Sequence, residues 1–370
     1  MIRPFTSVYV HVPFCAAKCD YCAFYSVPGA STALRGAYLK RLAAELAASA
    51  ALCAQMQSIY VGGGTPSFLT VEELEALLSS VRTEVSPAEG AEFTVECNPD
   101  SLTPAKVAVL ARHGVNRASL GIQSFNPKLR ETIGRRGSLE GLAEALESLR
   151  ANGITNIGMD FIYAIPGQSL EDWRSDLCRA VAAGVQHIST YELTVEEDAR
   201  LSGGKLPPVD EELSVAMWEE AAEATSPAGF RRYEVSNLAW PGYECRHNSE
   251  IWHGGTYLGV GPAASSFDGD VRRTNRADLE AWLNGAAPEE DRLPPAARAA
   301  EILALGLRTT KGWTREEFRS RTGFDYLELR GEVLTELARE GLLEVHGSDA
   351  IRPTARGLLF ADRVGRCLLG

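Results

Sequence analysis

The sequence predicts an α/β fold: a partial (β/α)6 barrel followed by a smaller C-terminal α+β domain. Two observations predict it. Short apolar or alternating runs typical of strands alternate with helical patterns six times up to Leu193, and there the alternation stops. Such alternation implies a parallel sheet, and right-handed crossovers with outer helices curl that sheet into part of a barrel. A doubly wound open sheet is the alternative.

The six expected strands are bounded by Gly, Pro or Asn. They cover Val8–Val12, Ser58–Gly62, Glu92–Cys97, Arg117–Gln123, Asn156–Ile165 and His187–Leu193. Helix start signals stand between them. Thr70–Glu73 and Ser169–Asp172 are capping boxes, Pro104 occupies a first helical position, and Ser138 is expected to cap a helix over Leu139–Arg150.

The second half of the chain predicts a different organisation. We expect a connection at Leu201–Pro208, a helix at Glu211–Glu223, a strand at Arg231–Leu238 and a linker from Ala286 to Pro295. Three amphipathic helices and a hairpin follow, which predict a winged-helix-like end: Arg298–Leu307, Arg315–Arg321, Tyr326–Glu340, then Leu342–Val345 and Ala350–Pro353. We therefore predict a barrel domain over residues 1–240 and a smaller domain over residues 241–370.

Composition limits the possible partners. The 370 residues carry a net charge of -12, which argues against nucleic acid held through phosphates and against an anionic membrane surface. The sequence has no apolar run long enough for a transmembrane segment and no signal-peptide pattern. We expect a cytoplasmic protein whose eight cysteines are mostly reduced.

Three of these cysteines form a motif. Cys15, Cys19 and Cys22 have the spacing C-x3-C-x2-C and directly follow the first expected strand, at the barrel end where active sites are built. Four irons need a thiolate each, so three local thiolates leave one iron of a [4Fe–4S] cluster open for a small molecule. S-adenosylmethionine can chelate such an iron through its amino and carboxylate groups. A structural zinc site is the alternative, but His11 is the only nearby fourth ligand.

The motifs around these cysteines form a wider pattern. They are His11–Cys22, Gly62–Ser67, Glu96–Pro99, Gly121–Phe125 and Asp160–Pro166. Together they resemble the radical-SAM branch that contains the anaerobic coproporphyrinogen III oxidase and the HemW heme chaperones, over nearly the whole chain. In the oxidase a further cysteine stands two residues after the third, whereas this chain has Phe24 there, as the chaperones do.

The resemblance implies a set of cofactor-binding residues. Gly63, Gly64 and Thr65 match the loop that receives the amino group of S-adenosylmethionine, and Glu96 can accept hydrogen bonds from that group or from a ribose. Tyr9 and Tyr21 border the nucleoside or the cluster. Gln123, Arg135 and Asp160 match positions that hold a second S-adenosylmethionine in the oxidase.

The resemblance also implies heme binding. The chaperones carry an H-N-x-x-Y-W motif linked to heme, and this chain has His247, Asn248 and Trp252 with Ile251 in place of the tyrosine. A neutral imidazole suits iron, and a hydrogen-bonding loop histidine is the alternative role. The leading hypothesis is a heme chaperone that transfers heme to an unidentified acceptor protein and needs a reductant for its cluster. The alternative is a radical-SAM enzyme acting on a porphyrin or another ring, as an oxidase or a methyltransferase.

Overall fold

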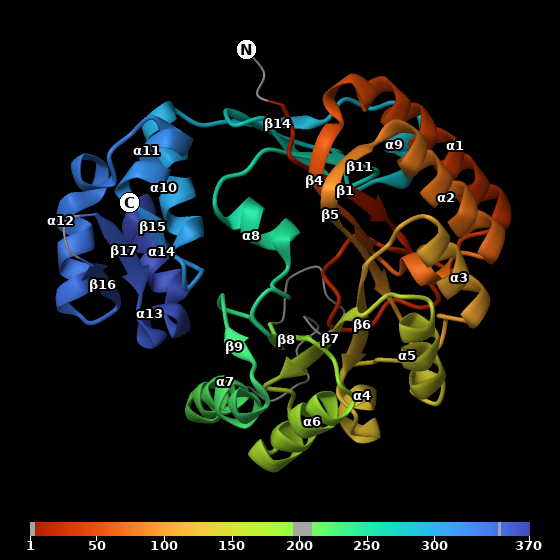
Figure 1. Cartoon of the computed structure of the whole chain (residues 1–370), viewed down its shortest axis with the longest axis horizontal. Helices are drawn as coiled ribbons and strands as arrows, with labels where there is room; N and C mark the ends of the chain where they lie inside the picture. Colours follow the sequence, from red (N-terminus) through yellow and green to blue (C-terminus); the bar gives the residue numbers. More distant parts are fainter. Residues whose placement is uncertain (1–3, 195–208, 347–348) are drawn as a thin grey trace.

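The larger domain is a curled, mostly parallel sheet. The computed structural model describes residues 4–194, 209–346 and 349–370, so the predicted connection Leu201–Pro208 lies outside it. Within these ranges the sheet has twelve strands in the order β14-β13-β12-β11-β1-β4-β5-β6-β7-β8-β10-β9. Neighbours from β11 to β8 run parallel and curl into an open barrel (Figure 1).

The six predicted strands form the middle of this sheet. They are β1 (Ser7–Val12), β4 (Ala54–Gly63), β5 (Ser86–Cys97), β6 (Arg117–Gln123), β7 (Asn156–Tyr163) and β8 (His187–Glu192). Alternation divides each strand between two faces. On β1, Val8, Val10 and Val12 are fully buried in the main core, whereas Tyr9 and His11 point to the other face, toward the barrel interior. Each buried Val contributes roughly 1.5–3 kcal/mol.

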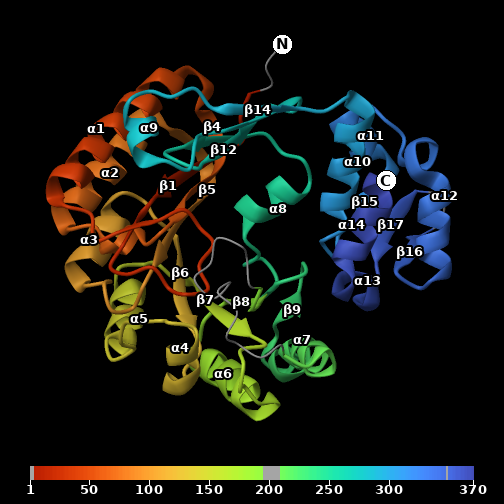
Figure 2. The same cartoon turned by 180° about the vertical axis from the view of Figure 1, so that it is seen from behind.

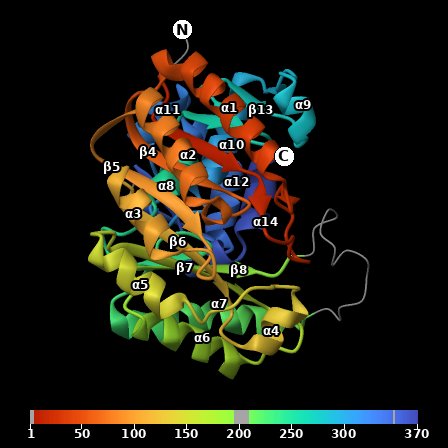
Figure 3. The same cartoon turned by 90° about the vertical axis from the view of Figure 1, so that its right-hand side faces the viewer.

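Helices cover the outer face of the sheet, and several of them are seen from outside in Figure 3. They are α1 (Thr32–Ser49), α2 (Val71–Glu84), α3 (Pro104–Arg112), α4 (Pro127–Thr132), α5 (Leu142–Ala151), α6 (Leu170–Ala182) and α7 (Glu211–Thr225). Their leucines and other apolar side chains pack on the valines and isoleucines of the strands. The capping boxes predicted at Thr70 and Ser169 are both formed.

One predicted helix start was wrong. The helix expected from Leu139 begins at Leu142, and its cap residue Gly141 supplies no side chain. Ser138 does not cap it, because the Ser138 hydroxyl accepts a hydrogen bond from the amide of Glu140, at 3.0 Å, in the preceding turn. Local side-chain bonds of this kind compete with helix formation.

Further strands extend both edges of the sheet. They are β9 (Arg231–Arg232) and β10 (Asn237–Ala239) at one edge, and β11 (Tyr257–Val260), β12 (Ser265–Phe267), β13 (Val271–Thr274) and β14 (Glu289–Arg292) at the other. The single strand predicted over Arg231–Leu238 was wrong: β9 and β10 are antiparallel, joined by a turn in which Glu234 accepts from the amide of Ser236. The predicted linker after Ala286 contains β14.

The barrel sheet continues well beyond residue 240. Strand β11 pairs in parallel with β1, and Leu258, Val260, Leu279 and Trp282 belong to the barrel core. The helix α9 (Leu279–Leu283) and the strands up to Arg292 therefore lie in the larger domain, whereas the sequence prediction assigned everything after residue 240 to the smaller one.

The smaller domain has its own core, seen in blue in Figures 1 and 2. Its elements are α10 (Pro295–Gly306), β15 (Trp313–Thr314), α11 (Arg315–Thr322), α12 (Tyr326–Arg339), β16 (Leu343–His346), β17 (Ala350–Pro353), α13 (Ala355–Leu359) and α14 (Ala361–Leu369). The three amphipathic helices and the hairpin occur as predicted, and β15 adds a third strand. Leu303, Phe318 and Leu368 are fully buried at the centre.

Candidate active site

A cavity of about 870 Å³ opens at the carboxyl ends of the parallel strands. This is the end of a barrel at which strands present side chains to a ligand. Eleven residues predicted from the sequence line it, together with Asn248: Cys15, Cys19, Cys22, Tyr21, Gly63, Gly64, Thr65, Glu96, Gln123, Arg135 and Asp160. The fold thus gathers nearly all predicted cofactor residues in one space.

The three cysteines share one loop at this cavity. Cys15 ends the short strand β2 (Phe14–Cys15), which pairs with β3 (Val27–Pro28) and closes the loop between them. Burial raises the pKa of the Cys15 and Cys22 thiols, and the nearby cation of Lys18 opposes the rise. Among the described residues no three His, Cys, Asp or Glu side chains could hold one metal ion. Cysteine thiolates are the ligands that hold iron–sulfur clusters.

Arg135 connects the cysteine loop to the strand ends. Its guanidinium lies 3.7 Å from the Cys19 sulfur and donates hydrogen bonds to Asn98 Oδ1 at 2.6 Å and to the carbonyl of Gly121 at 2.8 Å. Arg135 thus places a fixed positive charge beside a cysteine of the loop, which suits the negative charge of thiolate-bound iron. The charge and geometry of this corner fit an iron–sulfur cluster.

The glycine run Gly62–Gly64, at the end of β4, is required by close packing. A Cβ on Gly62 would lie 2.7 Å from the Glu96 carboxyl carbon, and a Cβ on Gly64 would lie 2.6 Å from the Phe14 carbonyl oxygen. Gly63 has a φ of 113° and a Cβ there would meet the ring of His11 at 2.6 Å. Backbone groups alone therefore border the cavity here.

Glu96 stands at the end of β5 with its carboxylate held from two sides. Tyr60 donates to Oε1 at 2.8 Å and the amide of Gly63 donates to Oε2 at 3.0 Å. Burial outweighs these bonds and raises the pKa of Glu96 to about 7, with the Asp160 carboxylate contributing. A bound group that donates hydrogen bonds would stabilise the ionised form.

Strands β6 and β7 supply the opposite wall. Gln123 has a φ of 70° next to a register shift between β6 and β7, a left-handed conformation that is costly outside glycine and turns its side chain into the cavity. Asp160 accepts from the Ser119 hydroxyl, at 3.0 Å to each oxygen, and burial raises its pKa. Tyr9, unlike the others, is absent from this lining; its hydroxyl contacts His11 Nδ1 at 3.1 Å.

The cavity also has residues that the sequence prediction missed. Among them, Arg117 and Ser119 stand on β6, while His187 and Ser189 stand on β8. They occupy alternate strand positions, and Arg117 and Ser119 share the interior face with Gly121. Period-two alternation along strands whose inward face was already indicated could have found them.

The three predicted heme residues do not share one space. They lie on α8 (Arg246–Trp252), between the barrel strands and the smaller domain (Figures 1 and 2). His247 is 2% exposed, its Nδ1 is bonded to Ser58 Oγ at 2.8 Å, and burial lowers its pKa to about 3. Asn248 lines the cavity, whereas Trp252 lies under the guanidinium of Arg308 at 5.3 Å.

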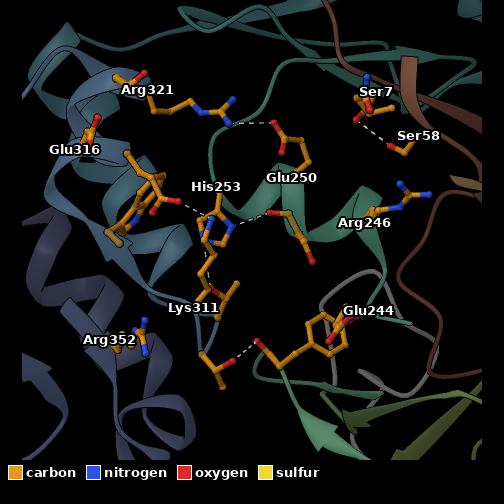
Figure 4. Close-up of a pocket in the computed structure, with 18 residues that line it drawn as sticks. Ser7, Ser58, Glu244, Arg246, Glu250, His253, Lys311, Glu316, Arg321 and Arg352 are labelled. Carbon is orange, nitrogen blue, oxygen red and sulfur yellow. Dashed lines mark hydrogen bonds and ion pairs between the residues drawn. The ribbon is translucent and has the colours of Figure 1, made fainter. Parts of the chain in front are cut away.

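A second cavity of about 1090 Å³ lies on the other side of α8 (Figure 4). It separates the barrel from the smaller domain. Arg321 of α11 reaches Glu250 of α8 at 3.0 Å, and the His253 ring contacts the Gly312 carbonyl at 3.2 Å. The Arg321–Glu250 ion pair therefore joins the two walls of this cleft. No helix in the described part of the chain is long and apolar enough to cross a membrane.

Comparison with known proteins places this geometry in a family. Residues 9–177 match the model of the radical SAM superfamily, and residues 293–360 match the HemN C-terminal domain. The chain is 34% identical to the heme chaperone HemW of Lactococcus lactis, over 98% of this chain and 97% of that protein. The chain belongs to the HemW family. Identity is 36% with HemW of Mycobacterium tuberculosis (100% and 95% covered) and 30% with HemW of Escherichia coli (97% and 97%).

A solved structure supports the architecture of this HemW-family chain. The radical SAM enzyme coproporphyrinogen III oxidase (HemN) of Escherichia coli superposes with a TM-score of 0.83 at 21% identity, covering 100% of this chain and 91% of that one. The match confirms the fold predicted from the sequence: a radical-SAM partial barrel with a second C-terminal domain. The HemN C-terminal match begins at residue 293, immediately after β14.

Proposed function

We propose that this protein is a heme chaperone, which binds heme and transfers it to an acceptor protein, and which carries a [4Fe–4S] cluster and S-adenosylmethionine at its barrel mouth. The observation that carries the proposal is similarity over essentially the full length to HemW proteins of distant bacteria. The radical-SAM family implies the cluster and S-adenosylmethionine. Free cysteine thiols stay reduced in the cytoplasm, and we expect the protein to act there.

The cofactor roles follow from the cavity wall. Cys15, Cys19 and Cys22 would each bind one iron and leave the fourth open. The backbone at Gly63 and Gly64 would border the amino end of S-adenosylmethionine, with Glu96 accepting hydrogen bonds from its amino group or ribose. When bound and reduced, this pair of cofactors supplies radical chemistry, while the residues of the chain bind, orient and shield it.

For heme we propose that α8 contributes to binding, but that the residues of the motif have different roles from those expected from the sequence. Asn248 reaches the cavity, so it is the member of the motif that a ligand there would touch. His247 is bonded to Ser58, and its amide donates to Glu92 at 3.1 Å, which holds α8 against the barrel strands. Ligation of iron by His247 would require α8 to move.

The alternative is an enzyme that acts on a porphyrin or another ring. Phe24 argues for the chaperone: it stands where the oxidase has cysteine, lines the cavity and is 69% exposed. The two functions are separated by anaerobic reconstitution, reduction and incubation with S-adenosylmethionine and coproporphyrinogen. We expect no protoporphyrinogen and no substrate-dependent 5′-deoxyadenosine; accumulation of either would favour the enzyme.

A further inference from the structure

Two buried side chains that line the active-site cavity have polar atoms without a partner among the described residues. Arg117 is 2% exposed and His187 is 1% exposed, and both line the cavity. Nε and Nη1 of Arg117 and Nδ1 of His187 have no hydrogen-bond partner among the described residues. Leaving buried donors unpaired is costly, so each unpaired group in a folded protein calls for an explanation.

The side chains of Arg117, Ser119 and His187 converge beside Gly158. A Cβ placed on Gly158 of β7 would lie 3.3 Å from His187 Nδ1, 3.3 Å from Ser119 Oγ and 3.5 Å from Arg117 Nη2. Side chains from β6 and β8 therefore converge on one point above the bare backbone of β7. Arg117 Nη2, Ser119 Oγ and His187 Nδ1 therefore lie close enough to one another to contact one ligand group.

Two of the three converging groups, Arg117 and His187, can donate a hydrogen bond to a ligand, whereas the Ser119 hydroxyl donates to Asp160. Tyr233 Oη accepts from the amide of Cys245 at 3.2 Å, and its own hydrogen is free to donate to His187 Nε2, 2.8 Å away. Burial and the neighbouring Arg117 lower the pKa of His187 well below its usual value, so the ring is neutral. When Tyr233 donates to Nε2, the one hydrogen of the ring is on Nδ1. Arg117 remains a cation.

Two N–H donors and a positive charge around one point select an anionic oxygen. The acids that interact electrostatically with Arg117 accept hydrogen bonds from other groups in the described structure. Asp160 accepts from Ser119, Glu96 accepts from Tyr60 and the amide of Gly63, and Glu92 accepts from the amides of Arg246 and His247. We propose that Arg117 and His187 bind a carboxylate of a second ligand that enters the cavity below the cluster. This rests on the proposed function, because a heme propionate is the first source of such a carboxylate; the carboxylate of a second S-adenosylmethionine is the other.

The test compares hemin with hemin dimethyl ester, in which both propionates are blocked. The reconstituted protein is titrated with each, and S-adenosylmethionine is counted by equilibrium dialysis. Arg117→Met removes the charge, and Gly158→Ala fills the point while leaving both donors. Arg130→Met is the matched control, because Arg130 is also buried but donates to the carbonyls of Ile122 and Gly137. Melting temperatures report folding.

The wild-type protein should prefer hemin to its ester by about tenfold to hundredfold, the range for charge-assisted hydrogen bonds. Arg117→Met and Gly158→Ala should remove this preference, and Arg130→Met should keep it. Loss of a bound S-adenosylmethionine in the first two variants would instead assign the carboxylate to that ligand. If both variants left hemin preference and S-adenosylmethionine binding unchanged, the donors would hold only water and the proposal would be overturned. If the wild-type protein bound no hemin, the chaperone function would be refuted. The dialysis would still show whether Arg117 and His187 bind the carboxylate of a second S-adenosylmethionine.

Discussion

The binding of S-adenosylmethionine should depend on pH because Glu96 titrates, and the variant Glu96→Gln should lack this dependence. The pKa of this carboxyl is about 7 because of burial, so it is about nine-tenths ionised at pH 8 and one-tenth at pH 6. If the ligand donates hydrogen bonds to the ionised form, the wild-type advantage over Glu96→Gln should fall about tenfold from pH 8 to pH 6. Equilibrium dialysis of both reconstituted proteins measures it.

The stability of the ligand-free protein should depend on pH in the opposite direction to ligand binding: it should be higher at pH 6 than at pH 8. The folded pKa of Glu96 is raised above its unfolded value, so the neutral form stabilises the fold; this contribution is present at low pH and is lost as pH rises through 7. Glu96→Gln imitates the neutral form at all pH values. The melting temperature of wild type relative to this variant should therefore fall from pH 6 to pH 8. Equal pH profiles of binding and melting in both proteins would refute the reasoning.

Three further predictions concern the cysteine loop, the glycine run and the core of the smaller domain. Cys19→Ala should lose the broad absorbance near 400 nm expected of the family, and iron analysis should fall with it; full iron content would exclude Cys19 as a ligand. Gly64→Ala should destabilise the protein in a denaturant titration by about 1–3 kcal/mol, because its Cβ meets the Phe14 carbonyl. Gly36→Ala, with open space around it on α1, is the control and should stabilise by about 0.5–1 kcal/mol. Leu303→Ala should destabilise the smaller domain by about 2–5 kcal/mol while iron content stays constant.

Local sequence signals predicted the centre of the barrel well. Strand β6 was predicted with its observed bounds, Arg117–Gln123, because an apolar run with clear boundaries specifies a buried parallel strand. Helix starts with a hydroxyl and an acid three residues later also formed as expected. The helix after Ser138 formed, but it begins at Leu142 and not at Leu139. The Ser138 hydroxyl accepts a local hydrogen bond from the amide of Glu140 in the turn before it.

The sheet edges could not be predicted in the same way. Strand β11 pairs with β1 across about 250 positions of sequence, with Tyr257 opposite Ser7. Nothing in a four-residue strand indicates its distant partner, because register and pairing depend on tertiary packing. Short edge strands such as β9 and β14 carry charged side chains, which is typical of exposed edges and resembles a loop in sequence.

Some features of the candidate site could be predicted from the sequence and others could not. The cysteine loop and glycine run were found by spacing and resemblance. Iron ligation calls for thiolates, and close packing at the glycine run leaves no room for a side chain. The environment of His247 was not predictable: the bond to Ser58 and the burial that keeps its imidazole neutral arise only when α8 packs on the strands. Arg117 lacked a motif, although its position on an inward strand face was implied by alternation.

The central claim is tested most directly by anaerobic titration of the reconstituted, full-length protein with hemin, followed by gel filtration and heme analysis. Our account predicts saturation at about one heme per chain, with heme retained by the protein and with iron of the cluster and S-adenosylmethionine still bound. Binding that never saturates, or heme that separates completely from the protein on the column, would contradict it.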